Sequence, residues 1–459
     1  MRLFGLPLIL GAFALVGCGA PRGPETPARA AIHAPVTLPA IRTFSTPRPV
    51  PPNRSNADIA RDFLDLSFQL ESGRDLPRFT RFEEPVSIRV TGAPPPTLVS
   101  DLDRLIGRLR SEAGIDVRRV RGGAANITIE AVPRAQIRRA LPRAACFVVP
   151  NIDRLSEYRR MRNSRATNWA ALEKRERIAI FLPNDAAPQE VRDCLHEELA
   201  QALGPLNDLY RLSDSVFNDD NVHTVLTGFD MLVLRAYYDP VLRNGMTKNE
   251  VAAELPGILS RLNPRGESIA PRPAAATPRA WIDAIQTALG PGAGKSQRMS
   301  AARTALRIAE QQGWQDHRRA FSHFANGRLA QINNPQLAQS HFDRAEAFYR
   351  RTPGTDLHRA YLATHLAAYA VNDGRGVQAQ GLIGPHLDTA ERHENAALLA
   401  TLLLLRAEAL DLSGQVSEAQ SARLDSVGWA RYGFGSDWEV RAKINEIASL
   451  RSSGRQNGR

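Results

Sequence analysis

The stretch from Arg192 to Asp208 constrains the fold more than any other part of this 459-residue chain. It follows an apolar run at Ile178–Leu182, and its own apolar residues recur at helical spacing as far as Gly204. A glycine just after such a run is typical of the C-terminus of a helix. The sequence therefore predicts a buried strand followed by an amphipathic helix that ends at Gly204.

Three polar residues of this helix mark a candidate site. Glu197 and Gln201 are one turn apart on the same face, and Glu198 is adjacent to Glu197. Zinc peptidases place the two histidines of H-E-x-x-H at this spacing, with the glutamate as general base. Here Glu197 and Gln201 stand at the histidine positions, and Glu198 stands at the position of the base.

The residues that follow extend this correspondence. Gly204 stands where the longer motif turns the chain, and Asn207 stands where the third ligand would be, with Asp208 beside it. Ser215–Phe217 resembles the turn that carries a methionine below the metal, with phenylalanine in its place. The region therefore resembles a metzincin, with E-E-x-x-Q-x-x-G-x-x-N in place of H-E-x-x-H-x-x-G-x-x-H.

The same stretch carries a second resemblance, to an uncharacterised domain family of bacterial lipoproteins. It covers residues 58–262 and rests on R-D-C-L-H-E-E-L-A-Q-A-L-G, which begins at Arg192, and on S-V-F-N-D-D, which begins at Ser215. This resemblance implies a domain type and a location in the cell envelope. It implies no reaction.

Without imidazoles, the candidate site offers mainly oxygen ligands. Glu197, Gln201 and Asn207 would suit calcium or magnesium better than zinc. We therefore expect a degenerate site without a resident cofactor, with bound zinc or calcium as alternatives and a plain solvated or hydrogen-bonded surface as another. His223 and Asp219–Asp220 could complete such a site, although a lone histidine in a polar loop is more often a surface residue.

The first residues predict an envelope location. Residues 1–17 combine a positive Arg2 with an apolar run too short for a mature membrane-spanning helix. The L-V-G-C sequence that ends at Cys18 resembles the lipobox of bacterial lipoproteins, which implies cleavage before Cys18 and lipidation of that residue. Gly19 is not the aspartate that favours retention in the inner membrane. We expect a lipid anchor in the outer membrane, facing the periplasm.

Composition and periodicity divide the remaining chain. Residues 18–54 are rich in proline, which predicts a disordered tether. Residues 55–262 alternate helical patterns with strand patterns and are expected to form a zincin-like α+β domain. Residues 263–280 are rich in proline and alanine and are expected to be a linker. Residues 281–455 show only helical patterns.

The helical domain contains a weak internal repeat. Ala367–Gly374 and Ala407–Gly414 align at a spacing of forty residues, and Ala379 and Ala419 keep the same offset. Small residues at helix crossings resemble tetratricopeptide-type helical hairpins. We expect a helical-repeat domain that binds a protein partner, and an irregular helical bundle is the alternative.

Two other patterns argue against nucleic acid and nucleotides as partners. The net charge of +11 comes from scattered arginines without interleaved aromatic residues. Gly290–Ser296 is rich in glycine, but it is one residue short of a phosphate-binding loop and no strand precedes it. We expect neither partner.

The two remaining cysteines, Cys146 and Cys194, leave two possibilities. In an oxidising periplasm they form a disulfide. Two buried free thiols are equally compatible with the sequence, because it supplies no geometry.

These features favour a binding protein over an enzyme. We expect a degenerate peptidase-like domain that acts as a recognition module. The alternative is a metal-dependent hydrolase of periplasmic peptide or wall material with Glu198 as general base, and a third possibility is a purely structural scaffold.

Overall fold

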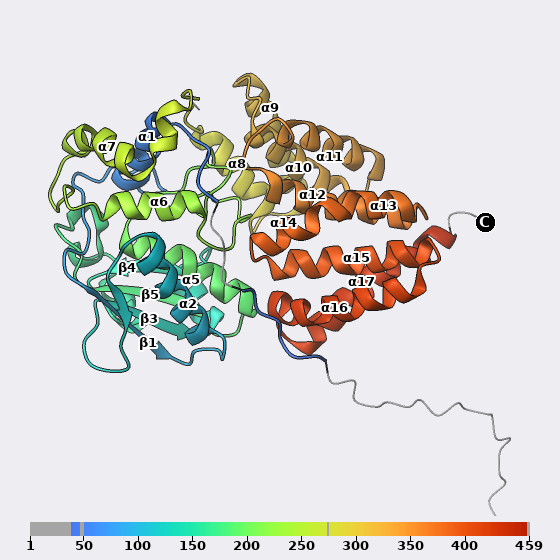
Figure 1. Cartoon of the computed structure of the whole chain (residues 1–459), viewed down its shortest axis with the longest axis horizontal. Helices are drawn as coiled ribbons and strands as arrows, with labels where there is room; N and C mark the ends of the chain where they lie inside the picture. Colours follow the sequence, from blue (N-terminus) through green and yellow to red (C-terminus); the bar gives the residue numbers. More distant parts are fainter. Residues whose placement is uncertain (1–37, 46–49, 273–274, 457–459) are drawn as a thin grey trace, which may run out of the picture. The chain divides into compact units, whose positions relative to one another are not determined.

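The computed structural model describes residues 38–45, 50–272 and 275–456, so the expected signal peptide and Cys18 lie outside the described residues. From Pro39 onward the chain forms one compact unit. Within the described ranges, an α/β region with a five-stranded sheet is followed by a helical region (Figure 1).

The sheet is mixed. Its strands lie in the order β2 (Val117–Arg119), β1 (Val86–Gly92), β3 (Ile127–Val132), β5 (Ile178–Pro183) and β4 (Phe147–Pro150). The first four are parallel, and the edge strand β4 is antiparallel to β5. Strand β5 matches the predicted apolar run. Strand β2 has only three residues, Val-Arg-Arg, which is too short for a periodic pattern.

Strand β5 is buried on both faces, which explains its uninterrupted apolar sequence. Alternate side chains of β5 enter two separate cores. One core also contains side chains of α1 (Asn56–Phe68), α2 (Leu98–Glu112) and α5 (Pro188–Leu203), and the other contains side chains of α3 (Arg134–Ala140) and α4 (Leu155–Met161). A strand with two buried faces favours a continuous apolar run over alternation.

Helix α5 confirms the helix predicted from the sequence. It begins with a proline and ends at Gly204. The Arg175 guanidinium holds its C-terminus by donating hydrogen bonds to carbonyl oxygens of Gln201, Ala202 and Gly204. A Cβ atom at position 204 would lie 3.2 Å from Leu234 Cδ2, so glycine permits α6 (Gly228–Tyr237) to pack closely.

The segment expected to be a linker is fixed to the α/β region. It follows α7 (Lys248–Leu262), and Asn263 Nδ2 donates to Asn56 Oδ1 at 2.9 Å. The Arg272 amide donates to Asp58 Oδ2 at 2.7 Å. These hydrogen bonds attach the segment to α1, a partner far away in the sequence.

The helical region consists of helices that pack as sequential neighbours. These are α8 (Arg279–Leu289), α9 (Lys295–Gln311), α10 (His317–Ala330), α11 (Pro335–Tyr349), α12 (Asp356–Asn372), α13 (Gly376–Ile383), α14 (Leu387–Arg392), α15 (Ala396–Leu412), α16 (Val416–Phe434) and α17 (Asp437–Gln456). Across the described residues, every helix falls short of the length and apolar character needed to cross a membrane.

The forty-residue spacing marks two equivalent helical hairpins. The turn between α12 and α13 contains Gly374 at φ +74°, and the turn between α15 and α16 contains Gly414 at φ +77°. Both glycines adopt the left-handed conformation that ends many helices. Ala379 and Ala419 are fully buried at equivalent positions of the second helices, which permits close helix crossing.

The end of the segment expected to be a disordered tether lies against the folded unit. The Phe44 ring stacks on Trp429 with centroids 4.5 Å apart, and Arg42 forms an ion pair with Asp425. The sequence pattern missed this packing because the apolar partner of Phe44 belongs to α16, almost four hundred residues away.

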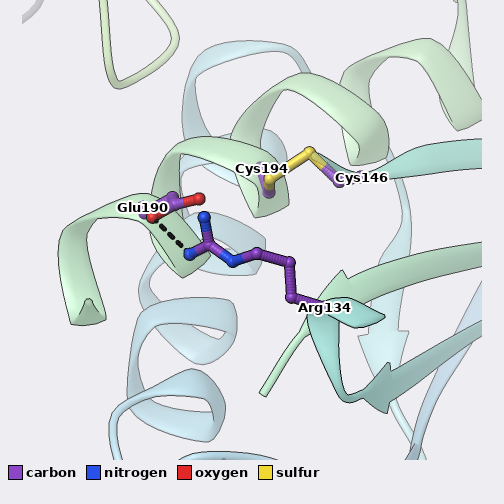
Figure 2. The surroundings of a disulfide bond; sticks show 4 residues. All are labelled: Arg134, Cys146, Glu190 and Cys194. Atoms are coloured by element: carbon purple, nitrogen blue, oxygen red, sulfur yellow. Dashed lines mark hydrogen bonds and ion pairs between the residues drawn. A yellow bond between two sulfur atoms is a disulfide. The ribbon is translucent and has the colours of Figure 1, made fainter. Parts of the chain in front are cut away.

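Cys146 and Cys194 are joined by a disulfide, with 6.0 Å between their Cα atoms (Figure 2). Cys146 immediately precedes β4, and Cys194 lies on α5. The bond therefore attaches the antiparallel edge of the sheet to the helix that carries the candidate site.

Arg192 joins α5 to the helical region. Its side chain is almost fully buried, and its guanidinium donates to the Glu394 backbone carbonyl and to Glu394 Oε2, the latter at 3.2 Å. The guanidinium also lies over the rings of Phe44 and Tyr432, at 5.7 and 5.2 Å from their centroids. One cation thus links α5, the N-terminal segment and the helical region.

Replacing this arginine by alanine is expected to destabilise the protein strongly. Arg192→Ala leaves the Glu394 carboxylate buried without its main positive partner, a loss that typically costs about 3–5 kcal/mol. Urea unfolding measures the change in the free energy of unfolding. The matched control is Arg134→Ala. This change removes the partly exposed ion pair between Arg134 on α3 and Glu190, which is on α5 like Arg192 (Figure 2). It should cost at most about 1 kcal/mol. Equal losses in the two variants would contradict this account.

Candidate functional site

The three polar residues of α5 that mark the candidate site are buried or partly buried. Glu198 and Gln201 are each 5% exposed, and Glu197 is partly exposed. The helix is covered by the sheet on its apolar side and by neighbouring segments on its polar side. This burial argues against a plain solvated face at Glu198 and Gln201.

Two other segments bring further carboxyl groups to this face. Glu71 comes from the loop after α1, and Asp208 and Asp219 come from the segment between α5 and α6. Gln201 Nε2 donates a long hydrogen bond to Glu71 Oε1 at 3.5 Å, which joins the loop after α1 to α5. We call Glu71, Glu197, Glu198, Asp208 and Asp219 the carboxylate cluster.

Burial and mutual repulsion raise the pKa of the groups in this cluster. Burial, followed by the charges of Glu71 and Asp219, raises the pKa of Glu197 to about 8. Burial and neighbouring carboxylates likewise raise the pKa of Glu198 and of Asp208 well above their ordinary values. A group of carboxyls out of water cannot all ionise together, so the cluster retains protons near neutral pH.

Two oxygens of the carboxylate cluster have no hydrogen-bond partner. Glu198 Oε2 and Asp208 Oδ1 are both buried and unpaired. A buried polar atom without a partner costs about 1–3 kcal/mol. The hydrogen-bonding capacity of the carboxylate cluster is therefore not fully satisfied within the folded chain.

A small cavity and a larger cleft adjoin the carboxylate cluster. The acid cavity has a volume of about 140 Å³, and Glu71, Asp208 and Asp219 line it. The cleft has a volume of about 940 Å³ and lies between the α5–α6 segment and helices α8, α10, α11 and α12. Tyr210, Asp219 and Gln286 line both, so the acid cavity is adjacent to the cleft.

Tyr210 and Gln286 set the position of Asp219 at this junction. The Tyr210 hydroxyl and Gln286 Nε2 each donate to Asp219 Oδ2 at 2.9 Å. The Tyr210 ring in turn packs edge-to-face on Trp281, with centroids 5.0 Å apart. The α/β region and α8 therefore build the junction together.

The structure does not bring Asn207 into the carboxylate cluster. Asn207 Nδ2 donates to the Asp65 backbone carbonyl at 2.9 Å and so holds the chain against α1. Asp208, the next residue, lines the acid cavity instead. Of the positions that matched zinc ligands, Glu197 and Gln201 lie at the cluster, whereas the third position has a structural role.

His223 belongs to a different group of side chains. Its ring lies 5.3 Å from that of His393 and 6.1 Å from that of His358, measured between centroids. His358 Nε2 lies 2.8 Å from Asp220 Oδ2. The adjacent acidic residues thus differ in role, since Asp219 lines the acid cavity and Asp220 attaches the segment to α12.

His196 on α5 and the Ser215–Phe217 turn hold the segment between α5 and α6 in place. The Leu226 amide donates to His196 Nδ1 at 3.1 Å, which fastens the end of the α5–α6 segment to α5. Asp230 accepts hydrogen bonds from the Ser215 hydroxyl and from the Val216 amide. Phe217 is fully buried in the core. Hydrogen bonds to Asp230 and the burial of Phe217 therefore hold this turn in place.

Within the residues that the structure describes, no three or more histidine, cysteine, aspartate or glutamate side chains are arranged to hold a metal ion. The carboxyl groups of the carboxylate cluster are near enough to perturb one another's ionisation, but they do not form a ligand sphere. The geometry of these residues is suited to hydrogen bonding.

Sequence reasoning missed Glu71, Tyr210 and the helical contribution to the cleft. Glu71 lies in a polar loop more than a hundred residues before α5 and carries no motif. In the sequence, Phe321 and Tyr361 cannot be distinguished from ordinary apolar residues of a helix, although they line the cleft. Asp208 and Asp219, by contrast, are candidates from the sequence alone, because of their places after α5 and in the acidic run after Phe217.

Comparison with known proteins finds one family match, which lies in the α/β region and assigns it no activity. Residues 56–257 match a family model described as a protein of unknown function (DUF2927). No curated protein and no solved structure matches the chain. The matched segment begins with α1 and ends within α7, so it contains the sheet, α5 and the residues of the carboxylate cluster.

The pKa of Glu197 predicts how stability depends on pH. Its pKa rises from an ordinary 4.5 to about 8 in the folded protein, so the folded state binds more protons than the unfolded state between these values. Stability contributed by the protonated group is present below about pH 4.5 and is lost as pH rises towards 8. Glu197→Gln should therefore gain stability over the wild type as the pH increases from 5.5 to 8.5.

Urea unfolding at the two pH values measures this gain. Glu190→Gln is the matched control, because Glu190 is a surface residue of the same helix and pairs with Arg134. A difference between Glu197→Gln and wild type that is independent of pH would contradict the assigned environment.

Proposed function

We propose that this chain is a lipid-anchored envelope protein whose α/β region, similar to a metzincin with its zinc ligands replaced, recognises a ligand in the cleft. The observation that carries the proposal is the cleft itself. Its volume of about 940 Å³ lies in the range of small-molecule and peptide sites. Both regions of the chain line it, so recognition requires them together.

The lining of the cleft suits binding. Aromatic rings from the helical region and the α5–α6 segment supply apolar contact area, and they are Tyr210, Phe321, Phe324, Tyr349 and Tyr361. Charged and polar side chains line the cleft as well, among them Arg143, Asp220 and Arg328. Apolar contact area together with polar groups that fix the orientation of a ligand is the usual composition of a ligand site.

The resemblance to a metzincin is supported by the framework around the candidate site. An apolar strand precedes α5, the helix ends at Gly204, and the residues of the Ser215–Phe217 turn are buried. The chemistry at the ligand positions differs, because Glu197 and Gln201 replace imidazoles and Asn207 faces the backbone of α1. A preserved framework with altered ligands favours recognition over hydrolysis.

A second candidate function is hydrolysis of peptide or wall material with Glu198 as general acid or base. The observation that favours it is the unpaired Glu198 Oε2, together with a pKa raised by burial and by Glu197. In that case Glu198→Gln abolishes turnover of peptide or peptidoglycan substrates. Binding without turnover in the wild type supports recognition instead.

The proposed location rests on the lipobox-like residues that end at Cys18. The Cys146–Cys194 disulfide supports it, because structural disulfides are typical of oxidising compartments such as the bacterial periplasm. We infer an outer-membrane anchor from Gly19, which follows the lipidated position.

The helical region supplies the second binding surface in this proposal. Its hairpins resemble tetratricopeptide repeats in their turn glycines and buried alanines, although the spacing is forty residues. Val377 and Val416 are 78% and 67% exposed beside the equivalent turns. Exposed apolar residues beside both turns support a protein partner for this region.

Filling the cleft tests the binding function. Thr287 lines the cleft and is partly exposed, so Thr287→Trp should reduce its free volume without disturbing a buried core. Calorimetric titration with a panel of tripeptides and peptidoglycan fragments should identify a probe whose affinity falls at least tenfold in Thr287→Trp. Ser300→Trp, on the exposed surface of α9, is the control and should bind as wild type. The proposal fails if no probe binds or if Thr287→Trp binds normally.

Replacing Cys18 tests the anchor. Cells grown with an alkyne analogue of palmitate should label the wild-type protein, and Cys18→Ser should lose the label and leave the membrane fraction. Cys146→Ser, which retains Cys18, should remain labelled. Equal labelling of wild type and Cys18→Ser would contradict lipidation at this residue.

A further inference from the structure

We propose that Val50–Arg54 is a flap that restricts access to a further cavity, and that the Arg54 side chain is its latch. This cavity, which we call the flap cavity, has a volume of about 490 Å³. Among the described residues, none of those that line it also lines the cleft or the acid cavity. The inference is therefore independent of the proposed function.

Three parts of the chain surround the flap cavity. All five residues of the flap line it on one side. Val225–Phe229, at the start of α6, line it from the α/β region, and His317 and Arg392 are among the residues that line it from the helical region. The volume is that of a small-molecule site. Because one side consists of five consecutive residues, a movement of this short segment changes access to the interior.

The backbone of the flap is held weakly. The flap contains no helix or strand, and its backbone forms no hydrogen bond to the backbone of any other described residue. Pro51 and Pro52 have no N–H group to donate, and adjacent prolines favour a stiff, extended chain. Val50 is 72% exposed. Segments with few backbone hydrogen bonds open at low cost in free energy, so side-chain contacts decide whether the flap stays closed.

Gly228 provides the surface on which the flap lies. A Cβ atom at this position would clash with the Val50 carbonyl oxygen. Glycine therefore permits the flap to lie directly against the first turn of α6. This close approach shows that the closed position of the flap is fitted to the α/β region.

Arg54 fastens the flap to three parts of the α/β region. Its guanidinium pairs with Asp62 of α1 at 3.1 Å and with Asp214 of the α5–α6 segment. The same group lies over the Phe229 ring of α6, 4.7 Å from its centroid. Carboxylates and an aromatic face are favourable partners of a guanidinium. The Arg54 side chain is 17% exposed, so these partners remove most of it from water.

The buried carboxylate of this contact does not depend on Arg54. Asp62 also pairs with Arg211 at 2.8 Å and with Arg61 at 3.2 Å, and both arginines lie outside the flap. The Asp214 side chain is 25% exposed, so water solvates it when Arg54 leaves. The α/β region therefore remains compensated after release of Arg54, and the role of this arginine is to hold the flap.

Thiol labelling inside the flap cavity tests the latch. Val225 lines the cavity and is 6% exposed, and Val225→Cys places a thiol there with little change in volume. N-ethylmaleimide should label this thiol at least tenfold faster when Arg54→Ala is added, as measured by peptide mass spectrometry on the full-length chain. Arg42→Ala is the control and should leave the rate unchanged, because it removes a half-exposed ion pair with Asp425 outside the lining of the cavity.

A second reporter distinguishes opening of the flap from a general loss of stability. Val371 on α12 is 1% exposed and lies outside the lining of the flap cavity. Arg54→Ala should leave the labelling rate of Val371→Cys unchanged. Equal acceleration at both reporters, or no acceleration of Val225→Cys, would overturn the inference.

The partner of the latch gives an additional test. Asp214→Asn should also accelerate the labelling of Val225→Cys, because it weakens the same contact. The combination with Arg54→Ala should be no faster than Arg54→Ala alone, since residues that act through one contact are not additive. If the two accelerations multiply, Arg54 and Asp214 act separately and the assigned latch is wrong.

Discussion

The burial of α5 on both sides is the constraint on which the rest of the structure depends. Its apolar side packs on a sheet whose strand β5 is itself buried on both faces. Its other side meets the α5–α6 segment and the helical region, to which Arg192 attaches it through Glu394. Glu198 and Gln201 are therefore removed from water and Glu197 is only partly exposed, so the chemistry of these side chains follows from their burial.

Carboxyl groups in such a position are costly unless protons, donors or cations compensate them. Here protons compensate Glu197, whose pKa reaches about 8, while Asp219 receives donors from Tyr210 and Gln286. Glu198 and Asp208 retain unpaired oxygens. The carboxylate cluster is therefore only partly compensated within the folded chain.

The α5–α6 segment connects the two regions of the chain. Tyr210 and Asp219 face the junction between the acid cavity and the cleft, and Asp220 contacts His358 on α12. His196 and Asp230 fix the segment to α5 and α6. The helical region is therefore part of the candidate site, although the matched family domain ends within α7.

The sequence by itself determined the elements whose signals are local. It predicted α5 with its end at Gly204, the buried strand before it and the helical hairpins forty residues apart, because periodicity and turn residues act over short distances. It located Glu197, Glu198 and Gln201 on one helix for the same reason.

Only the tertiary structure decided that Glu71, Asp208 and Asp219 join these three residues while Asn207 does not. It also decided that Cys146 pairs with Cys194, and that α8 and α10–α12 complete the cleft. These outcomes depend on contacts between segments far apart in the chain, for which the sequence carries no periodic signal.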